Sequence, residues 1–256
     1  MKVSVIIPAF NAEKTVRETI KSVLNQSFKE FELIVVNDGS TDKTKKIIEG
    51  FKEKTRIINV QHKGISSSRN IGARNAKEEI IAFLDADVTV EKDWLKKLIK
   101  PFKEEKDLFG VSGIVRSKST GSIESDFFCF SIGSSEFQGY NVAFRKKEFL
   151  EMKGYNEELR YGEDPELVWR AFNNGMKLKK ANALAFHRTY GLIERLKAQK
   201  EYAFCDAKVI KKNFPSVFRD PINFLSKAPK NIQYILGFYF ITFLSWIAAV
   251  IILIIS

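Results

Sequence analysis

Asp85 and Asp87, which are separated by one residue, are the strongest candidates in this chain for residues that carry out chemistry. They follow the apolar run 80–84, which predicts a buried strand. Side chains at alternate positions of an extended segment point the same way, so both carboxylates can face one small site. Such a pair needs a compensating cation or hydrogen-bond donors, and Mg²⁺ or Mn²⁺ binds carboxylates together with phosphates. The pair indicates metal-assisted handling of a nucleotide diphosphate; a solvated acidic loop is the alternative.

Three further strands are expected to position this pair. Apolar runs at 3–7, 31–36 and 56–60 predict them, and helices are expected over about 12–26 and 43–51. Each run ends in turn-forming or polar residues. With the run 80–84, they predict a parallel sheet whose strand ends line one edge, which is where α/β folds bind ligands.

The segments at these strand ends resemble, in their order, those of family 2 glycosyltransferases with the GT-A fold. They are 8–11 (Pro-Ala-Phe-Asn), 37–42 (Asn-Asp-Gly-Ser-Thr-Asp), Gly64 with 69–72 (Arg-Asn-Ile-Gly), 85–87, 139–145, 154–157 and 162–167. Each motif is weak alone, but the ordered set, over roughly residues 1–190, is specific. Asn37 departs from the family, where Asp is common. The chain also lacks a Gln-x-x-Arg-Trp segment, which favours single-sugar transfer over processive synthesis.

The resemblance implies a nucleotide-sugar site. Its expected members are Pro8, Phe10, Asn11, Asp38, Gly64, Arg69, Asn70, Asp85 and Ala86. Asp38 would accept a hydrogen bond from the base, or else stabilise only its own turn. Arg69 would contact the diphosphate, because guanidinium forks suit phosphate oxygens; the alternative is a surface arginine. Asp85 is expected to face the ribose or to bind through water.

The resemblance also implies a divalent metal, Mn²⁺ or Mg²⁺, bound by Asp87. His187, after the predicted strand 177–186, is expected to complete the metal or diphosphate site. The metal would neutralise the leaving nucleoside diphosphate. Asn141 is expected to lie near the donor sugar or the acceptor.

Asp164 is the expected general base, which would take the proton of the acceptor hydroxyl during inverting transfer. Glu163 is the close rival of Asp164 for this role and, like Asn141, is expected near the donor sugar or the acceptor. The sequence Asp164-Pro165-Glu166 also predicts a helix start with Asp164 as N-cap and Pro165 at the first helical position. A cap position would hold a catalytic carboxylate on a rigid element.

The C-terminal sequence predicts a membrane span. Residues 231–256 carry no charge, and 236–255 are almost wholly apolar. About 20 such residues make a helix of roughly 30 Å, enough to cross a bilayer; a buried core or dimer helix is the alternative. Lys227 and Lys230 precede the span and predict a cytoplasmic catalytic domain. We expect a single-pass membrane protein, or a multi-pass one if the chain continues into further spans.

A net charge of +11 raises the question of an anionic partner. Nucleic acid is disfavoured, because the chain lacks helix-turn-helix, zinc-finger and aromatic RNA-binding signatures. Residues 191–214 instead predict a basic amphipathic helix on an anionic membrane surface, with a core-packing helix as the alternative. The two cysteines, Cys129 and Cys205, indicate neither a disulfide framework nor a metal site.

Together these features predict an α/β chain. A GT-A, Rossmann-like and mostly parallel sheet with helices on both faces is expected over 1–214, a Pro-containing membrane-proximal linker over 215–230, and a transmembrane helix over 231–256. The expected function is inverting, metal-dependent transfer of one sugar from a nucleotide-diphosphate sugar. A polyprenyl phosphate or lipid-linked glycan is the expected acceptor. Two alternative functions are a nucleotidyltransferase and a non-enzymatic, membrane-tethered basic binding module. A nucleotidyltransferase would carry a Gly-rich first loop with basic residues, which segment 8–11 lacks. A binding module would leave the carboxylates at the strand ends unexplained.

Overall fold

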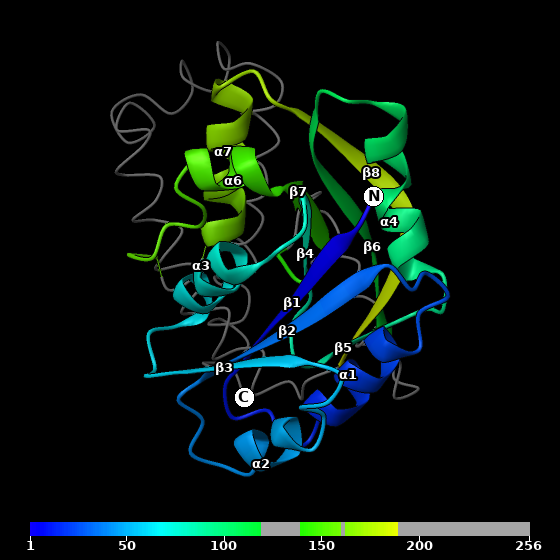
Figure 1. Cartoon of the computed structure of the whole chain (residues 1–256). Helices are drawn as coiled ribbons and strands as arrows, with labels where there is room; N and C mark the ends of the chain where they lie inside the picture. Colours follow the sequence, from blue (N-terminus) through cyan, green and yellow to red (C-terminus); the bar gives the residue numbers. More distant parts are fainter. Residues whose placement is uncertain (119–138, 160–161, 189–256) are drawn as a thin grey trace, which may run out of the picture.

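The computed structural model describes residues 1–118, 139–159 and 162–188 (Figure 1). These residues form one eight-stranded sheet with the order β3-β2-β1-β4-β7-β6-β8-β5. The strands are β1 (Val3–Ala9), β2 (Phe31–Asp38), β3 (Arg56–Val60), β4 (Ile80–Phe83), β5 (Val88–Val90), β6 (Leu108–Lys118), β7 (Val142–Arg145) and β8 (Lys177–Arg188).

One half of the sheet is parallel, as predicted. β3, β2, β1 and β4 are adjacent and pair in parallel, so their carboxyl ends meet at one edge. Helices α1 (Val16–Leu24), α2 (Thr44–Glu49) and α3 (Ile65–Asn75) connect them. The other half is mixed, because β7 runs antiparallel to both β4 and β6. There β8 pairs in parallel with β6 and antiparallel with β5, which brings the end of β8 beside the Asp85–Asp87 segment.

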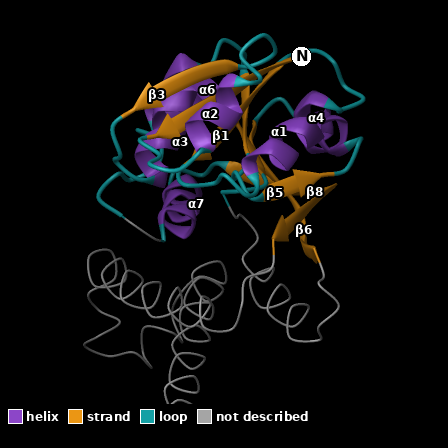
Figure 2. Cartoon of the chain, turned by 90° about the horizontal axis from the view of Figure 1, so that it is seen from below, coloured by secondary structure: helices purple, strands orange, loops and turns teal. Residues whose placement is uncertain are grey.

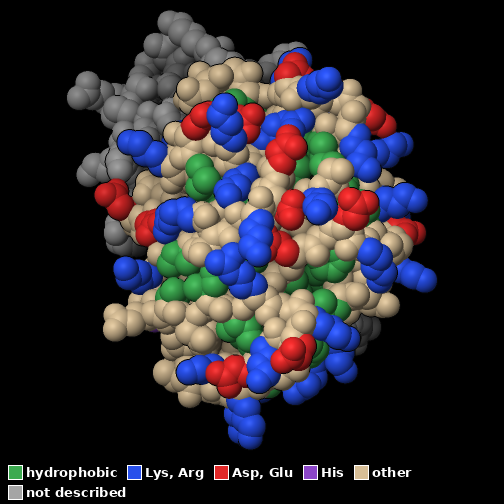
Figure 3. Space-filling view, viewed as in Figure 1, with side chains coloured by type: hydrophobic (Ala, Val, Ile, Leu, Met, Phe, Trp, Pro, Cys, Tyr) green, Lys and Arg blue, Asp and Glu red, His purple; other side chains and the backbone are tan. Residues whose placement is uncertain are grey.

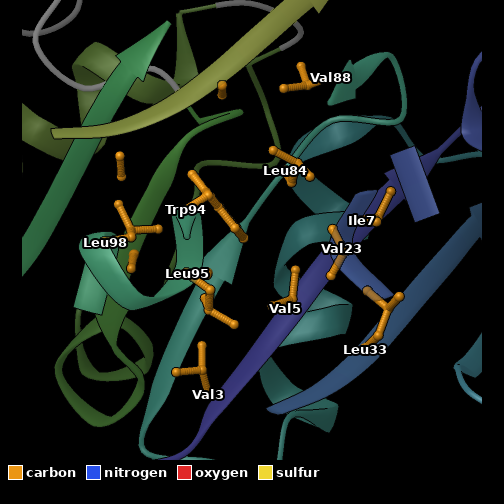
Figure 4. Close-up of a cluster of buried hydrophobic side chains, with 14 of the residues drawn as sticks. Val3, Val5, Ile7, Val23, Leu33, Leu84, Val88, Trp94, Leu95 and Leu98 are labelled. Atoms are coloured by element: carbon orange, nitrogen blue, oxygen red, sulfur yellow. The ribbon is translucent and has the colours of Figure 1, made fainter. Parts of the chain in front are cut away.

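The core lies in two layers, one on each face of the sheet. Val3, Val5 and Ile7 of β1 pack on one side with α1 and with α4 (Trp94–Glu104) (Figure 4). Ile6 points to the other side, which α3, α6 (Lys146–Glu151) and α7 (Glu163–Asn173) cover. Figure 2 shows α1 and α4 on one side of the strands and α3 and α6 on the other. Burial on both faces explains why the strands are continuous apolar runs rather than alternating ones.

Gly72 lets α3 lie directly against the sheet. A Cβ at this position would come within 2.3 Å of Ile6 Cγ2 on β1. No side chain larger than hydrogen therefore fits without displacing the helix or Ile6.

The predicted start of α7 was wrong. The helix begins at Glu163, and Gly162 occupies the N-cap position with φ of 80°. Asp164 is thus the second helical residue, not the cap. Glycine adopts this left-handed conformation without steric cost. Pro165 is tolerated as the third residue because the first-turn N–H groups lack intrahelical partners.

Several predictions fall outside the described residues. They are the linker over 215–230, the transmembrane helix over 231–256, the basic helix over 191–214, and both cysteines. Within residues 1–118, 139–159 and 162–188, no helix has the length and apolarity needed to cross a membrane.

Candidate functional site

A cavity of about 990 Å³ opens at the carboxyl ends of the parallel strands. The loops after β1, β2, β3 and β4 line it, together with residues 157–159 and Arg188. The structure brings eight of the predicted site residues to its wall, namely Pro8, Phe10, Asn11, Asp38, Gly64, Asp85, Ala86 and Asp87. A cavity of this size holds a ligand larger than a single sugar or a single base.

The Asp38 carboxylate joins two loops of the cavity. It accepts hydrogen bonds from the backbone N–H groups of Lys63 and Gly64, each at 2.9 Å, and from His62 Nδ1 at 2.9 Å. Its side chain is only 3% exposed. Asp38 therefore holds the loop after β3 against the end of β2. Its predicted contact with a nucleotide base stays a prediction.

An aromatic pair stands at the wall of the same cavity. The rings of Phe10 and His62 stack with centroids 4.0 Å apart and an interplanar angle of 20°. Phe10 is 44% exposed. The sequence prediction missed His62. The available signal was its place in the loop after β3, two residues before Gly64.

Asp85 and Asp87 both line the cavity but have different partners. Asp87 Oδ2 lies 3.6 Å from His187 Nε2, whereas Asp85 Oδ1 accepts a hydrogen bond from Arg69 Nη2 at 2.9 Å. His187 Nδ1 lies 2.7 Å from the carbonyl oxygen of Arg188. A carbonyl only accepts hydrogen bonds, so Nδ1 carries the proton and Nε2 faces Asp87. A backbone carbonyl commonly orients a metal-binding histidine in this way.

Asp87 and His187 fit a divalent ion that takes its other ligands from phosphate and water. Within the described residues, no group of three or more His, Cys, Asp or Glu side chains is placed to bind a metal. Mg²⁺ and Mn²⁺ sites in nucleotide enzymes commonly combine one or two carboxylates with substrate phosphates.

Arg69 is buried, so the alternative of a surface arginine was wrong. Its side chain is 1% exposed, and its guanidinium lies 5.1 Å from the Tyr155 ring. Nη1 contacts Glu163 Oε1 at 2.9 Å and Asp164 Oδ1 at 3.4 Å. Neither Arg69 nor Asn70 is among the described residues that line the cavity, although both were predicted to contact the nucleotide. Asp85 therefore connects the cavity with these buried groups.

The first turn of α7 carries two adjacent acids whose proton affinity is increased. Burial raises the pKa of Asp164 above its ordinary value, against the opposing effects of Arg69, the Gly139 N–H and the Tyr155 hydroxyl. Burial and the neighbouring Asp164 raise the pKa of Glu163 to about 7. An acid with a raised pKa near neutrality suits proton transfer. Asp164 keeps about a fifth of its side chain exposed, whereas Glu163 keeps 9%.

Two asparagines predicted to lie at the site, Asn70 and Asn141, form hydrogen bonds with other parts of the protein. Asn70 donates to Tyr155 O at 2.8 Å and accepts from Tyr155 N at 2.9 Å. Asn141, expected near the donor sugar or acceptor, is 1% exposed. It accepts from Trp94 Nε1 at 2.7 Å and donates to the carbonyl groups of Ile114 and Ala183, each at 3.1 Å. These bonds hold β6, β7 and β8 to α4.

The sequence matches the family model of glycosyl transferase family 2 over residues 4–156. The chain belongs to this family. A second model, described as the N-terminal domain of galactosyltransferase, matches residues 120–202.

Among curated relatives, the chain is 28% identical over 176 residues to the glucosyl-dolichyl phosphate glucuronosyltransferase of Haloferax volcanii. That match covers 61% of this chain and 56% of the relative. The chain is also 31% identical over 140 residues to glycosyltransferase GlyA of Streptococcus pneumoniae, covering 54% of this chain and 20% of GlyA. The chain thus spans about half of the first relative and a fifth of the second.

Solved structures share the fold. The mannosyltransferase PcManGT of Pyrobaculum calidifontis, in complex with GDP-Man and Mn²⁺, has a TM-score of 0.67 at 19% identity, covering 97% of this chain and 75% of that chain. S. aureus TarS 1-349, in complex with UDP-GlcNAc, has a TM-score of 0.57 at 20% identity, covering 91% and 78%. The predicted GT-A fold and the family resemblance are therefore confirmed.

Proposed function

We propose that this protein transfers one sugar from a nucleotide-diphosphate sugar to an acceptor hydroxyl, with inversion at the anomeric carbon. The observation that carries the proposal is the position of Asp85. It lines the cavity and also binds Arg69, which contacts the acidic pair of α7. A donor cavity and a candidate base are thereby adjacent, as a transfer between two substrates requires. Family membership favours this function over a nucleotidyltransferase or a binding module.

The donor's nucleotide is proposed to occupy the part of the cavity between the loops after β1, β2 and β3. The stacked rings of Phe10 and His62 present an aromatic surface there, and Asp38 lies at the same wall. Planar bases bind to such surfaces by stacking. The solved neighbours in complex with GDP-Man and with UDP-GlcNAc support a nucleotide sugar as the ligand class.

The charge of the cavity favours a cation with the anionic donor. Seven lining residues are acidic, Glu13, Asp38, Asp42, Asp85, Asp87, Glu157 and Glu158, against the cations Lys14, Lys63 and Arg188. A diphosphate entering this cavity would be repelled without further positive charge. Asp87 and His187 are the proposed ligands of Mn²⁺ or Mg²⁺, and the ion would supply charge neutralisation for the leaving diphosphate. Mn²⁺ in the PcManGT complex supports this choice.

Asp164 is the proposed base. The acceptor oxygen forms a bond to the anomeric carbon from the face opposite the diphosphate. Its proton moves to a carboxylate oxygen of Asp164, and the bond from the anomeric carbon to the diphosphate oxygen breaks, with the electron pair leaving on the diphosphate. The raised pKa of Asp164 increases its ability to take the proton, provided that it is ionised.

A membrane-associated acceptor, a polyprenyl phosphate or lipid-linked glycan, is proposed on two grounds. The apolar sequence 236–255 is long enough to cross a bilayer, and the name of the relative from Haloferax volcanii contains glucosyl-dolichyl phosphate, a lipid-linked sugar. The catalytic domain would then lie on the cytoplasmic side. Sedimentation of the full chain with membranes, and its release only by detergent, tests this part.

The donor proposal is tested by thermal stabilisation of the purified chain. UDP or GDP with Mn²⁺ should raise the melting temperature, by an amount that follows ligand concentration over Kd. A panel of UDP- and GDP-sugars is then assayed for metal-dependent hydrolysis and for transfer to polyprenyl phosphate. Absence of both stabilisation and turnover across the panel would reject the proposal.

A further inference from the structure

The guanidinium of Arg69 joins three carboxylates from separate parts of the chain. Asp85 follows β4, while Glu163 and Asp164 lie in the first turn of α7. Figure 1 shows α3, which carries Arg69, on the same side of the sheet as α7. We infer that Arg69 is a positioning residue, which orients Asp164 toward the acceptor hydroxyl and ties it to Asp85 at the donor cavity. This inference rests on the proposed function.

The geometry of the contact uses the fork of an arginine. Nη2 is directed at Asp85 and Nη1 is shared by Glu163 and Asp164, at distances of 2.9, 2.9 and 3.4 Å. Nε is buried and has no hydrogen-bond partner in the described structure. A lysine presents a compact point charge and cannot hold groups on two sides in this way. The two ends of the fork thus set the distance between Asp85 and the acids of α7.

Other groups enclose Asp164 and leave it little freedom. Tyr155 donates a hydrogen bond to its carboxylate, as does the backbone N–H of Gly139. A Cβ at position 139 would lie 2.2 Å from Asp164 Oδ1 and 2.6 Å from Arg69 Nη1. Asn70, next to Arg69 on α3, holds Tyr155 through the two hydrogen bonds described above. Asn70 therefore holds the residue that donates to Asp164, in addition to the direct contact that Arg69 makes.

The charges of this group also govern when Asp164 is ionised. The titratable groups facing the pair are Arg69, Asp85 and Tyr155. Burial raises the pKa of both acids and Arg69 lowers it. Loss of the fork therefore raises the pKa of Asp164 further, so that the base is protonated at a higher pH. Activity that depends on ionised Asp164 should then appear only at higher pH.

The test is the pH dependence of kcat in Arg69→Lys and Tyr155→Phe, measured in the full chain. Arg69→Lys keeps a positive charge but loses the fork, and we expect kcat near pH 7 to fall about 10- to 100-fold. The acid limb of the profile should move to higher pH, so part of the loss is recovered at about pH 9. Tyr155→Phe keeps the packed ring and should give a smaller shift in the same direction.

Arg145→Lys is the matched control. Arg145 is also buried, at 9% exposure, lies 5.5 Å from the Phe102 ring, and pairs with Glu79 at 2.7 Å. Its replacement should lower the melting temperature without moving the pH profile. If the wild type is active and the pH profile of kcat is unchanged in Arg69→Lys, the positioning role is wrong. The same conclusion follows if Arg145→Lys shifts the profile as much as Arg69→Lys does. Neither outcome would contradict the proposed function. A wild type without turnover on any donor would reject the proposed function and the positioning role together.

Discussion

The Asp87 carboxylate faces the His187 imidazole, with Oδ2 3.6 Å from Nε2. The backbone enforces this relationship, because Val88 pairs with His187 in the antiparallel β5–β8 ladder and Arg188 N donates to Asp87 O at 3.3 Å. The two side chains thus meet through strand register, and Asp87 lines the cavity.

The surface charge does not by itself mark this site. Figure 3 shows Lys and Arg interspersed with Asp and Glu over the visible surface. The geometry of Asp87 and His187 therefore locates the candidate metal site more specifically than the surface charge does.

Asp87→Ala should strongly reduce metal-dependent turnover while the fold is retained. The variant loses a ligand of the ion that would neutralise the leaving diphosphate, and removal of such stabilisation costs on the order of 10² to 10³ in kcat. Turnover is measured with Mn²⁺ and with excess EDTA, and the melting temperature reports the fold. Undiminished wild-type activity in EDTA would show that the metal assignment is wrong.

Asp164→Asn should lower kcat by about 10² to 10⁴-fold, because the amide cannot take the acceptor's proton. Donor affinity should be unchanged. Since Gly162 and not Asp164 occupies the N-cap position, Asp164→Ala should cost little through capping. The two variants are compared by single-turnover kinetics and by thermal melting. Near-normal turnover in Asp164→Asn would move the base assignment to Glu163.

Glu163→Gln should reduce the pH dependence of stability, because it removes one of the two acids of α7 whose pKa is raised. The folded-state pKa of Glu163 is about 7, above its ordinary value of 4.5, so the folded state binds the proton more tightly than the unfolded state does. Glu163 therefore favours folding most below about pH 4.5, and this contribution is lost as pH rises toward 7. We expect a decline of about 2 kcal/mol in the free energy of unfolding.

Urea unfolding at about pH 5 and pH 8 measures this decline in the wild type and in Glu163→Gln. Glu53→Gln, at an exposed glutamate in the loop before β3, is the control and should leave the decline unchanged. An equal decline in wild type and Glu163→Gln would contradict the prediction.

Asn141→Ala should destabilise the fold by about 2–4 kcal/mol, because the Trp94 N–H and two buried carbonyl groups lose their partner. Chemical denaturation gives the change in unfolding free energy. Asn173→Ala, at an exposed position of α7, serves as the comparison. A stable Asn141→Ala with impaired transfer would instead support the original expectation that Asn141 lies near the sugar.

The parallel half of the fold could be predicted because its strands are buried on both faces. Their continuous apolar runs end in polar turns, and topology then brings Asp38, Gly64 and Asp85 to one edge. The environment of Arg69 could not be predicted. Its partners come from residues 85, 163 and 164, and an arginine after three serines has no local signal of burial. The α7 cap was misjudged because proline is tolerated beyond the first helical position.

The close packing at Gly72 places Arg69 and Asp85 on one unit of the structure, whereas Glu163 and Asp164 lie on another element. Because α3 lies against Ile6 without an intervening side chain, Arg69 is carried by the same rigid unit of sheet and helix that presents Asp85. Glu163 and Asp164 belong to a separate helix and reach this unit through side-chain contacts. Any adjustment of the proposed base to acceptors of different shape would therefore have to involve α7, Gly139 and the contacts of Asp164 with Arg69, while Arg69 and Asp85 keep their geometry.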